Sequence, residues 1–346
     1  MFLTVWELLG VHGLKSEPRV DSETLFDLVK LAFGVVGGAG ALVALVVAYR
    51  RQRVDEDAAL RESTRLHTER FTTAVSQLGE ESAAVRLGGV HALAGLADDA
   101  PTRALRQTCI DVLCAFLRLP YTPEAELAAD DAQARHAYLA LREARHTIIR
   151  LIRDHLRLSH DHVHSWQGHD FDFSNAVFDG GDWNQAQFSG GHVSFAGAHF
   201  TGSEVDFSGA RFCGSQVDFG EAVFSASRVD FVVAEFSGGE IIFEEAKFAG
   251  GRLSFLGAQF KGSGVFFITT EFLGVDVCFS RAIFDSGQVV FVGDFSGGKI
   301  SFDHAHFLGA EIDFDGSQFS GCDFELENSI GNTPAGLPPS SGNSIP

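Results

Sequence analysis

The residues from Val193 to Gly264 read VSFAGAHFTGSE, VDFSGARFCGSQ, VDFGEAVFSASR, VDFVVAEFSGGE, IIFEEAKFAGGR and LSFLGAQFKGSG, six successive versions of one twelve-residue block. Each block has an aliphatic residue, a Phe, an Ala and a second Phe at fixed places. The same spacing extends beyond this stretch on both sides, with a slip of one residue between Phe291 and Phe302. The Phe residues predicted to form the repeat core are Phe195, Phe200, Phe207, Phe212, Phe219, Phe224, Phe231, Phe236, Phe243, Phe248, Phe255 and Phe260.

The spacing within a block requires the chain to turn. Val205 and Phe207 are two residues apart, so both side chains point to one face of an extended strand. The step from Phe207 to Ala210 is odd, which would place the next inward pair on the opposite face of a flat strand. We therefore expect a corner between them, at glycines such as Gly209 and Gly214. Short strands joined by regular corners form a solenoid in which like side chains stack coil on coil.

The charge of the chain is concentrated in this repeat half. The 346 residues carry a formal net charge of −20, and residues 165–330 contain 24 Asp and Glu against 7 Lys and Arg. Nucleic-acid binding needs Lys and Arg to displace the counterions of the phosphate backbone. We therefore expect no direct nucleic-acid binding.

An uncharged stretch near the N-terminus predicts a transmembrane helix. Residues 31–49 read LAFGVVGGAGALVALVVAY, close to the roughly 20 residues that cross a bilayer, and Arg50, Arg51 and Arg53 follow directly. The positive-inside rule then places the C-terminal domains in the cytoplasm of a single-pass protein of the cell (inner) membrane. Gly34 and Gly38 form a GxxxG pair that allows a homodimer within the bilayer.

Between this segment and the repeats the pattern is helical. One helix is expected to continue from the basic collar to Leu78, with Gly79 as a left-handed C-terminal cap. A second is expected over 82–97, where Gly88 and Gly89 permit close packing. A third is expected from Pro101 to before Pro120, and a fourth from an N-cap at Thr122, with Pro123 at its first position, to about Leu158.

The repeat resembles the pentapeptide-repeat family, which has a small residue two before a central Leu or Phe, as in Ala210-Arg211-Phe212-Cys213-Gly214. The resemblance covers about 171–324 and implies a right-handed quadrilateral β-helix with the central residue inside. This sequence departs from strict five-residue phasing, because its inward Phe residues alternate spacings of five and seven. We infer two dodecamers, about 24 residues, per coil and roughly six coils.

The helical region is similar to the membrane-proximal part of bacterial membrane-bound pentapeptide-repeat-containing proteins. Three motifs carry this similarity, HTERFTTAVSQLG at 67–79, VRLGGVHALAGLA at 85–97 and DVLCAFLR at 111–118. No activity is established for that family. The resemblance therefore implies an architecture and a location, with no cofactor.

One cluster could carry metal chemistry. His160, His162 and His164, within a group that extends from His155 to His169, would share a face of an extended segment and could hold Zn²⁺ or Ni²⁺. The alternative is a polar, solvated linker. No GxSxG, HExxH or nucleotide-binding loop is present, and acidic pairs such as Glu244 and Glu245 are expected on a solvated face. The five scattered cysteines, Cys109, Cys114, Cys213, Cys278 and Cys322, are expected to be reduced thiols.

The sequence thus predicts an α plus all-β solenoid architecture. Its expected parts are an N-terminal segment at 1–24, either interfacial or part of a second membrane segment, a transmembrane helix and basic collar at 25–53, a helical domain at 54–160, a repeat β-helix at 161–330 and a disordered tail at 331–346. The expected function is a non-enzymatic, membrane-anchored scaffold that presents an acidic solenoid to a partner protein. The alternatives are a DNA-mimicking regulator of a type II topoisomerase and a metal-responsive sensor.

Overall fold

The computed structural model describes residues 21–128, 130–202, 204–225, 228–332 and 334–337. The chain divides into two compact units, 1–65 and 66–346. Most of the predicted N-terminal segment and residues 338–346 of the predicted tail lie outside the described residues.

The first unit contains most of one long helix, α2 (Ser22–Leu78). It begins near Asp21, passes through the apolar stretch and the basic collar, and continues without a break, as the sequence predicts. Every described side chain from 21 to 62 is exposed. The helix is long and apolar enough to cross a membrane.

The second unit starts with the end of α2 and three further helices: α3 (Ala83–Asp98), α4 (Arg103–Arg118) and α5 (Ala132–Arg157). Gly89 on α3 explains one close approach, because a Cβ there would lie 2.5 Å from the Leu78 backbone nitrogen. Gly88, also expected to permit close packing, has nothing within 4 Å of such a Cβ.

Three of the predicted helix ends are wrong in detail. Gly79 ends α2 by donating to backbone carbonyls of the last turn, and its φ is not among the positive ones. Thr102, not Pro101, precedes α4 and caps it, accepting a hydrogen bond from the Leu105 backbone N–H at 3.3 Å. The predicted fourth helix from Thr122 is a short 3₁₀ helix (Glu124–Glu126), and α5 begins only after Asp131, whose carboxylate accepts from the Ala134 N–H at 2.8 Å. A carboxylate cap satisfies an otherwise unpaired backbone donor and fits the positive end of the helix.

The rest of the second unit is a parallel β-solenoid of about seven turns, which confirms the predicted solenoid and adds a turn to the six expected. Its strands in the first coils are β1 (Phe171–Asp172), β2 (Val177–Phe178), β3 (Gly181–Asp182), β4 (Gln187–Ser189), β5 (His192–Ser194), β6 (His199–Phe200), β7 (Val205–Asp206), β8 (Arg211–Cys213), β9 (Gln216–Asp218), β10 (Val223–Phe224), β11 (Arg228–Asp230) and β12 (Glu235–Ser237). The later strands are β13 (Glu240–Ile242), β14 (Lys247–Ala249), β15 (Arg252–Ser254), β16 (Gln259–Leu273), β17 (Asp276–Cys278), β18 (Ile283–Ser296), β19 (Lys299–Ser301), β20 (His306–Phe307), β21 (Glu311–Asp313), β22 (Gln318–Ser320), β23 (Asp323–Glu325) and β24 (Ile330–Gly331).

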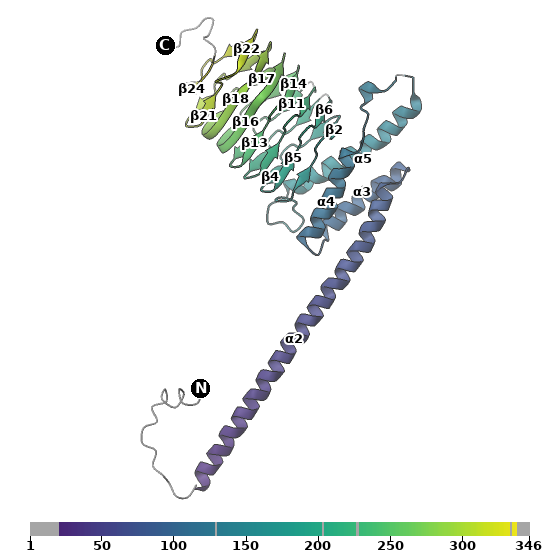
Figure 1. Ribbon diagram of the computed structural model, residues 1–346, viewed down its shortest axis with the longest axis vertical. Coiled ribbons are helices and arrows are strands. Elements are labelled where there is room, and N and C mark those ends of the chain that lie inside the picture. Colours follow the sequence, from purple (N-terminus) through teal and green to yellow (C-terminus); the bar gives the residue numbers. More distant parts are fainter. Residues whose placement is uncertain (1–20, 129, 203, 226–227, 333, 338–346) are drawn as a thin grey trace. The chain divides into compact units, whose positions relative to one another are not determined.

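Strand pairing runs coil to coil in four parallel ladders (Figure 1). In one ladder Val205 pairs with Val229 and Val229 with Leu253, so partners are 24 residues apart. Each of the long strands β16 and β18 passes through three ladders, which joins them into one large sheet. The slip of one residue in the sequence shifts the pairing register between β16 and β18. Thr269 has no partner in β18, and Phe272 pairs with Phe295, 23 residues further on.

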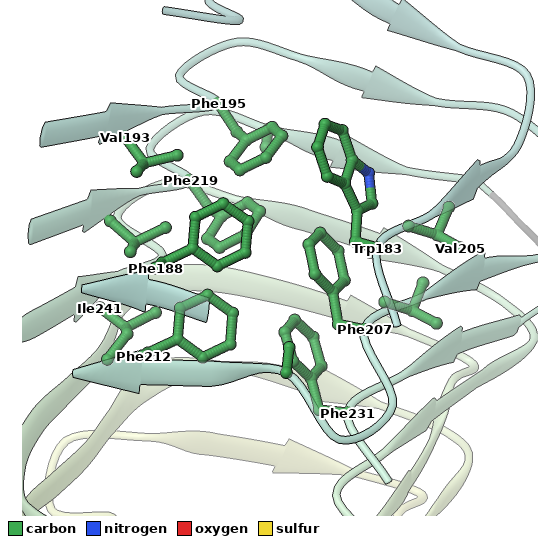
Figure 2. Close-up of a cluster of buried hydrophobic side chains, with 14 of the residues drawn as sticks. Trp183, Phe188, Val193, Phe195, Val205, Phe207, Phe212, Phe219, Phe231 and Ile241 are labelled. Carbon is green, nitrogen blue, oxygen red and sulfur yellow. The ribbon is translucent and has the colours of Figure 1, made fainter. Parts of the chain in front are cut away.

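The interior is filled by stacked aromatic rings (Figure 2). Trp183 lies on Phe207 at a ring-centroid distance of 6.2 Å, and Phe207 on Phe231 at 4.9 Å with the rings 3° from parallel. All twelve core Phe residues named from the sequence are at most 1% exposed. Each such ring buries a large apolar area and gains further from its aromatic neighbours.

The corners are made by residues in the left-handed conformation. Gly209 has φ 65° and Gly214 φ 67°, at the places where the spacing predicts a turn. Among the described residues, nine other than glycine also adopt positive φ, each two after an inward residue, which the sequence pattern did not indicate. They are Asn175, Gln185, Glu221, Val233, Glu245, Thr269, Arg281, His304 and Asn328. For a β-branched residue such as Val233 (φ 50°) this conformation costs about 1–2 kcal/mol.

The solenoid core is continuous with the core of the helices. α4 packs against β1, and α5 against β3 and β4, so the helices cover the first coil (Figure 1). At the other end the first residues of the predicted tail join the solenoid, because Ala335 bridges Asp313 in parallel. A covered first coil leaves the outer sides of the later coils as the accessible surface.

Candidate functional site

Several aspartates of the repeat stabilise its turns. The residue between the inward aliphatic residue and the inward Phe points out of the coil, and in several coils it is an Asp whose side chain accepts the backbone N–H two residues further on. Asp206 accepts from Ser208, Asp218 from Gly220 and Asp313 from Asp315, each at 2.8 Å. This is the geometry for which Asp is favoured in turns. The recurrence of Asp or Ser at this place is the signal of these turns in the sequence.

One side of the solenoid carries eight acids and no basic residue. It consists of the aligned segments 216–221, 240–245, 264–269, 288–293 and 311–316, in which β9, β13, β16, β18 and β21 pair in register (Figure 1). We call this surface the acidic face. Its acids are Asp218, Glu221, Glu240, Glu244, Glu245, Glu311, Asp313 and Asp315, and these segments contain no Lys or Arg. Glu244 and Glu245 are exposed, so the negative potential reaches solvent.

The ladder half a coil away is different because basic residues accompany its acids. Arg228 Nη1 lies 3.8 Å from Glu204 Oε1, and Lys299 Nζ lies 2.7 Å from Glu325 Oε2. Arg252, next along the ladder from Arg228, adds another cation. The net negative charge is therefore unevenly distributed around the coil and is concentrated on the acidic face.

The predicted metal candidates do not form the arrangement that was expected of them. Residues 160–164 form turns rather than an extended strand, and His160, His162 and His164 are all exposed. The His162 and His164 rings meet edge to face at 5.5 Å, and His162 Nδ1 accepts from the His164 backbone N–H. Within the described residues no three His, Cys, Asp or Glu side chains are grouped so as to hold a metal ion.

The residues that follow are not a solvated linker. Trp166 is fully buried and stacks on His155 at 4.1 Å. Asp98 joins the two, with Oδ2 3.1 Å from His155 Nε2 and Oδ1 accepting from the Trp166 Nε1–H at 3.1 Å. Burial opposes charge on the imidazole, but the hydrogen bonds to Asp98 and to the Leu151 carbonyl raise the pKa of His155. Burial and two nearby arginines instead lower the pKa of His169 to about 4.

A second polar cluster fixes the helices to the first coil. Asp179, which follows β2, accepts hydrogen bonds from Tyr121 Oη at 2.6 Å, Tyr138 Oη at 2.8 Å and Arg142 Nε at 2.9 Å. Its other oxygen lies 2.9 Å from His146 Nε2. Burial acts against ionisation, yet these donors hold the pKa of Asp179 well below its usual range. Every donor on this carboxylate comes from the helical region, so the cluster is a structural joint.

The cysteines are thiols placed as the sequence suggests. All five are unpaired, and Cys109 and Cys114 are buried in the helical core. Burial raises the pKa of Cys109 to about 11, and a thiol that stays protonated is a poor nucleophile.

The chain matches no family model, no curated protein and no solved structure in the comparisons made with each.

Proposed function

We propose that the protein is a non-enzymatic scaffold, anchored in the inner membrane by a single span of α2, whose acidic solenoid recruits a partner protein on the cytoplasmic side. The apolar part of α2 is exposed along its length, and a basic collar follows it. Together these features support a membrane anchor and the cytoplasmic orientation. Gly34 and Gly38 offer a contact for a second copy in the bilayer.

We further propose that the solenoid is a right-handed, four-sided coil of the pentapeptide-repeat type. Four ladders and a 24-residue separation of partners support two dodecamers per coil. Repeat solenoids of this kind offer long regular surfaces on which a partner can bind.

The observation that carries the proposed function is the acidic face. It holds eight carboxylates without a single Lys or Arg over five aligned segments. The negative electrostatic potential of these carboxylates attracts a positively charged partner and raises its association rate, more so at low salt. It also repels nucleic acid.

Charge reversal on this face tests the proposal. The full-length chain would carry Glu240→Lys, Glu244→Lys and Glu311→Lys. The control is Asp285→Lys, at an exposed residue of β18 outside the acidic face. Proximity labelling from the solenoid in native membranes should lose its main cytoplasmic protein in the triple variant and keep it in the control. An unchanged set of labelled proteins would refute the scaffold role of this face.

A further inference from the structure

Three successive coils break the rule that polar side chains occupy the outward place before the second inward residue. Asp218 and Asp313 hold this place in the flanking coils, whereas Ile242, Phe266 and Val290 hold it between them. Ile242 pairs with Phe266 and Phe266 with Val290, so the three side chains are adjacent on the outside of the sheet. None of the three is fully buried.

A second column adjoins the first. Ile268 pairs with Val292, and both point outward two residues after Phe266 and Val290. Ile268 is 37% exposed and Val292 is half-buried. We call Ile242, Phe266, Ile268, Val290 and Val292 the apolar patch.

The backbone around the patch is arranged to display it. A Cβ on Gly264 would lie 2.5 Å from Phe266 Cε2 and 2.7 Å from its Cζ. The missing side chain therefore makes room for the aromatic ring beside the strand. β16 and β18 continue through this region as extended strands, where other coils have separate short strands. A contiguous apolar surface of this kind, bordered by polar groups, is typical of a binding site for another protein.

The charges around the patch specify what can bind. Asp218 lies beyond one end, Asp313 and Asp315 beyond the other, and Glu240 and Glu244 flank Ile242. The patch therefore lies inside the acidic face, with acids on its borders and no basic residue in the aligned segments. Positively charged side chains of a partner would pair with these carboxylates, around an apolar centre from which water is excluded.

We propose that the apolar patch and its acidic border bind a basic segment of the partner protein, in which Lys or Arg residues flank one or two large apolar side chains. This inference rests on the proposed scaffold function and specifies its binding site. Phe266 and Ile268 supply the apolar contact area. The border carboxylates select the charge of the partner and shield the centre from water.

Peptide binding to the full-length chain in nanodiscs of zwitterionic lipid provides the test. The probe is a fluorescent peptide with Leu-Val-Phe between Lys-Arg pairs, compared by anisotropy with one in which Ser replaces the three apolar residues. The F266S/I268S variant should bind the probe at least about tenfold more weakly. The matched control is L256S, an outward, half-buried residue on the ladder half a coil away. Binding should also weaken as salt rises from about 0.1 M to about 0.5 M.

Several results would overturn the inference. If the Ser-substituted peptide binds as tightly as the probe, charge alone is recognised. If F266S/I268S binds the probe as tightly as the native chain does, the apolar patch is not the binding site. Circular dichroism of F266S and I268S separately identifies a loss of fold, and the variant that keeps the fold then decides the matter.

Photo-crosslinking separates this inference from the scaffold proposal. A benzoylphenylalanine at Ile268 should crosslink to a basic segment of a partner in native membranes, and one at Leu256 should not. If both positions crosslink equally to one partner, the scaffold function is supported and the apolar patch is refuted as its specific binding site. If Ile268 crosslinks only to 50–54 of a second copy, a self-contact replaces the proposed partner. If neither position crosslinks to any protein, the scaffold proposal fails as well.

Discussion

The Asp179 cluster gives the sharpest prediction about how the helices of the second unit hold the solenoid. In Asp179→Asn the side chain keeps its shape and one acceptor oxygen but loses its charge. Four donors converge on the carboxylate, two of them from Arg142 and His146. Hydrogen bonds to charged groups contribute about 1.5–3 kcal/mol against about 0.5–1.5 kcal/mol for neutral ones. We therefore expect Asp179→Asn to lower the free energy of unfolding by about 2–4 kcal/mol.

The loss should be confined to one end of the solenoid. Each coil contacts only its neighbours, so the effect of a joint at the first coil decays along the array. Hydrogen exchange measured by mass spectrometry should show faster exchange in 171–200 and in α5, with little change in 255–300. Asp285→Asn, at an exposed residue, is the control. A uniform increase along the solenoid, or no increase at 171–200, would refute the reasoning.

The pH dependence supplies a second readout of the same variant. Because the folded pKa of Asp179 is lowered, its contribution is complete above the unfolded pKa, about 4, and is lost as the pH falls through the folded value. The difference in unfolding free energy between native chain and Asp179→Asn should thus be constant at neutral pH and shrink only in strong acid. A difference that disappears already near pH 6 would contradict this assignment.

Three other predictions follow from single residues. Val233→Gly should stabilise the solenoid by about 0.5–1 kcal/mol in denaturant unfolding, because glycine adopts positive φ without strain. The gain is less than the full strain energy because glycine also raises the conformational entropy of the unfolded chain. Gly239→Ala should destabilise far more than Gly214→Ala in thermal melts, since both have positive φ but only a Cβ at 239 would meet a backbone oxygen, at 2.2 Å; equal effects would contradict the packing. Asp98→Asn should lower the free energy of unfolding most below about pH 6.5, and by less as the pH rises through the folded pKa of His155, which is raised. A decrease that is independent of pH in urea titrations would count against the ion pair.

The repeat was predictable because its physical cause is local and periodic. Inward Phe residues at fixed spacing, such as Phe207 and Phe231, must stack to be buried together, and glycines mark the corners. The non-glycine corners were not predictable, since Val233 or Thr269 has no intrinsic preference for positive φ and adopts it only because neighbouring coils impose it.

The net negative charge of the candidate site could be predicted from the sequence, but the arrangement of its side chains could not. The excess of acid is visible in the composition, but its concentration on one face depends on which dodecamers align, a consequence of the 24-residue pairing. The apolar patch is hidden for the same reason, because Ile242, Phe266 and Val290 become neighbours only across coils. The buried cluster at Trp166 joins residues nearly 70 positions apart through Asp98, and no local pattern encodes such a contact.

Crosslinking mass spectrometry on intact membranes with the protein at native level tests the central claim most directly. The exposed amines of Lys247 and Lys261 lie on the outside of the solenoid, just after segment 240–245 and just before segment 264–269 of the acidic face. We expect reproducible crosslinks from these lysines to one cytoplasmic protein. Crosslinks only to other copies of the chain, or to proteins on the opposite side of the membrane, would contradict a cytoplasmic scaffold.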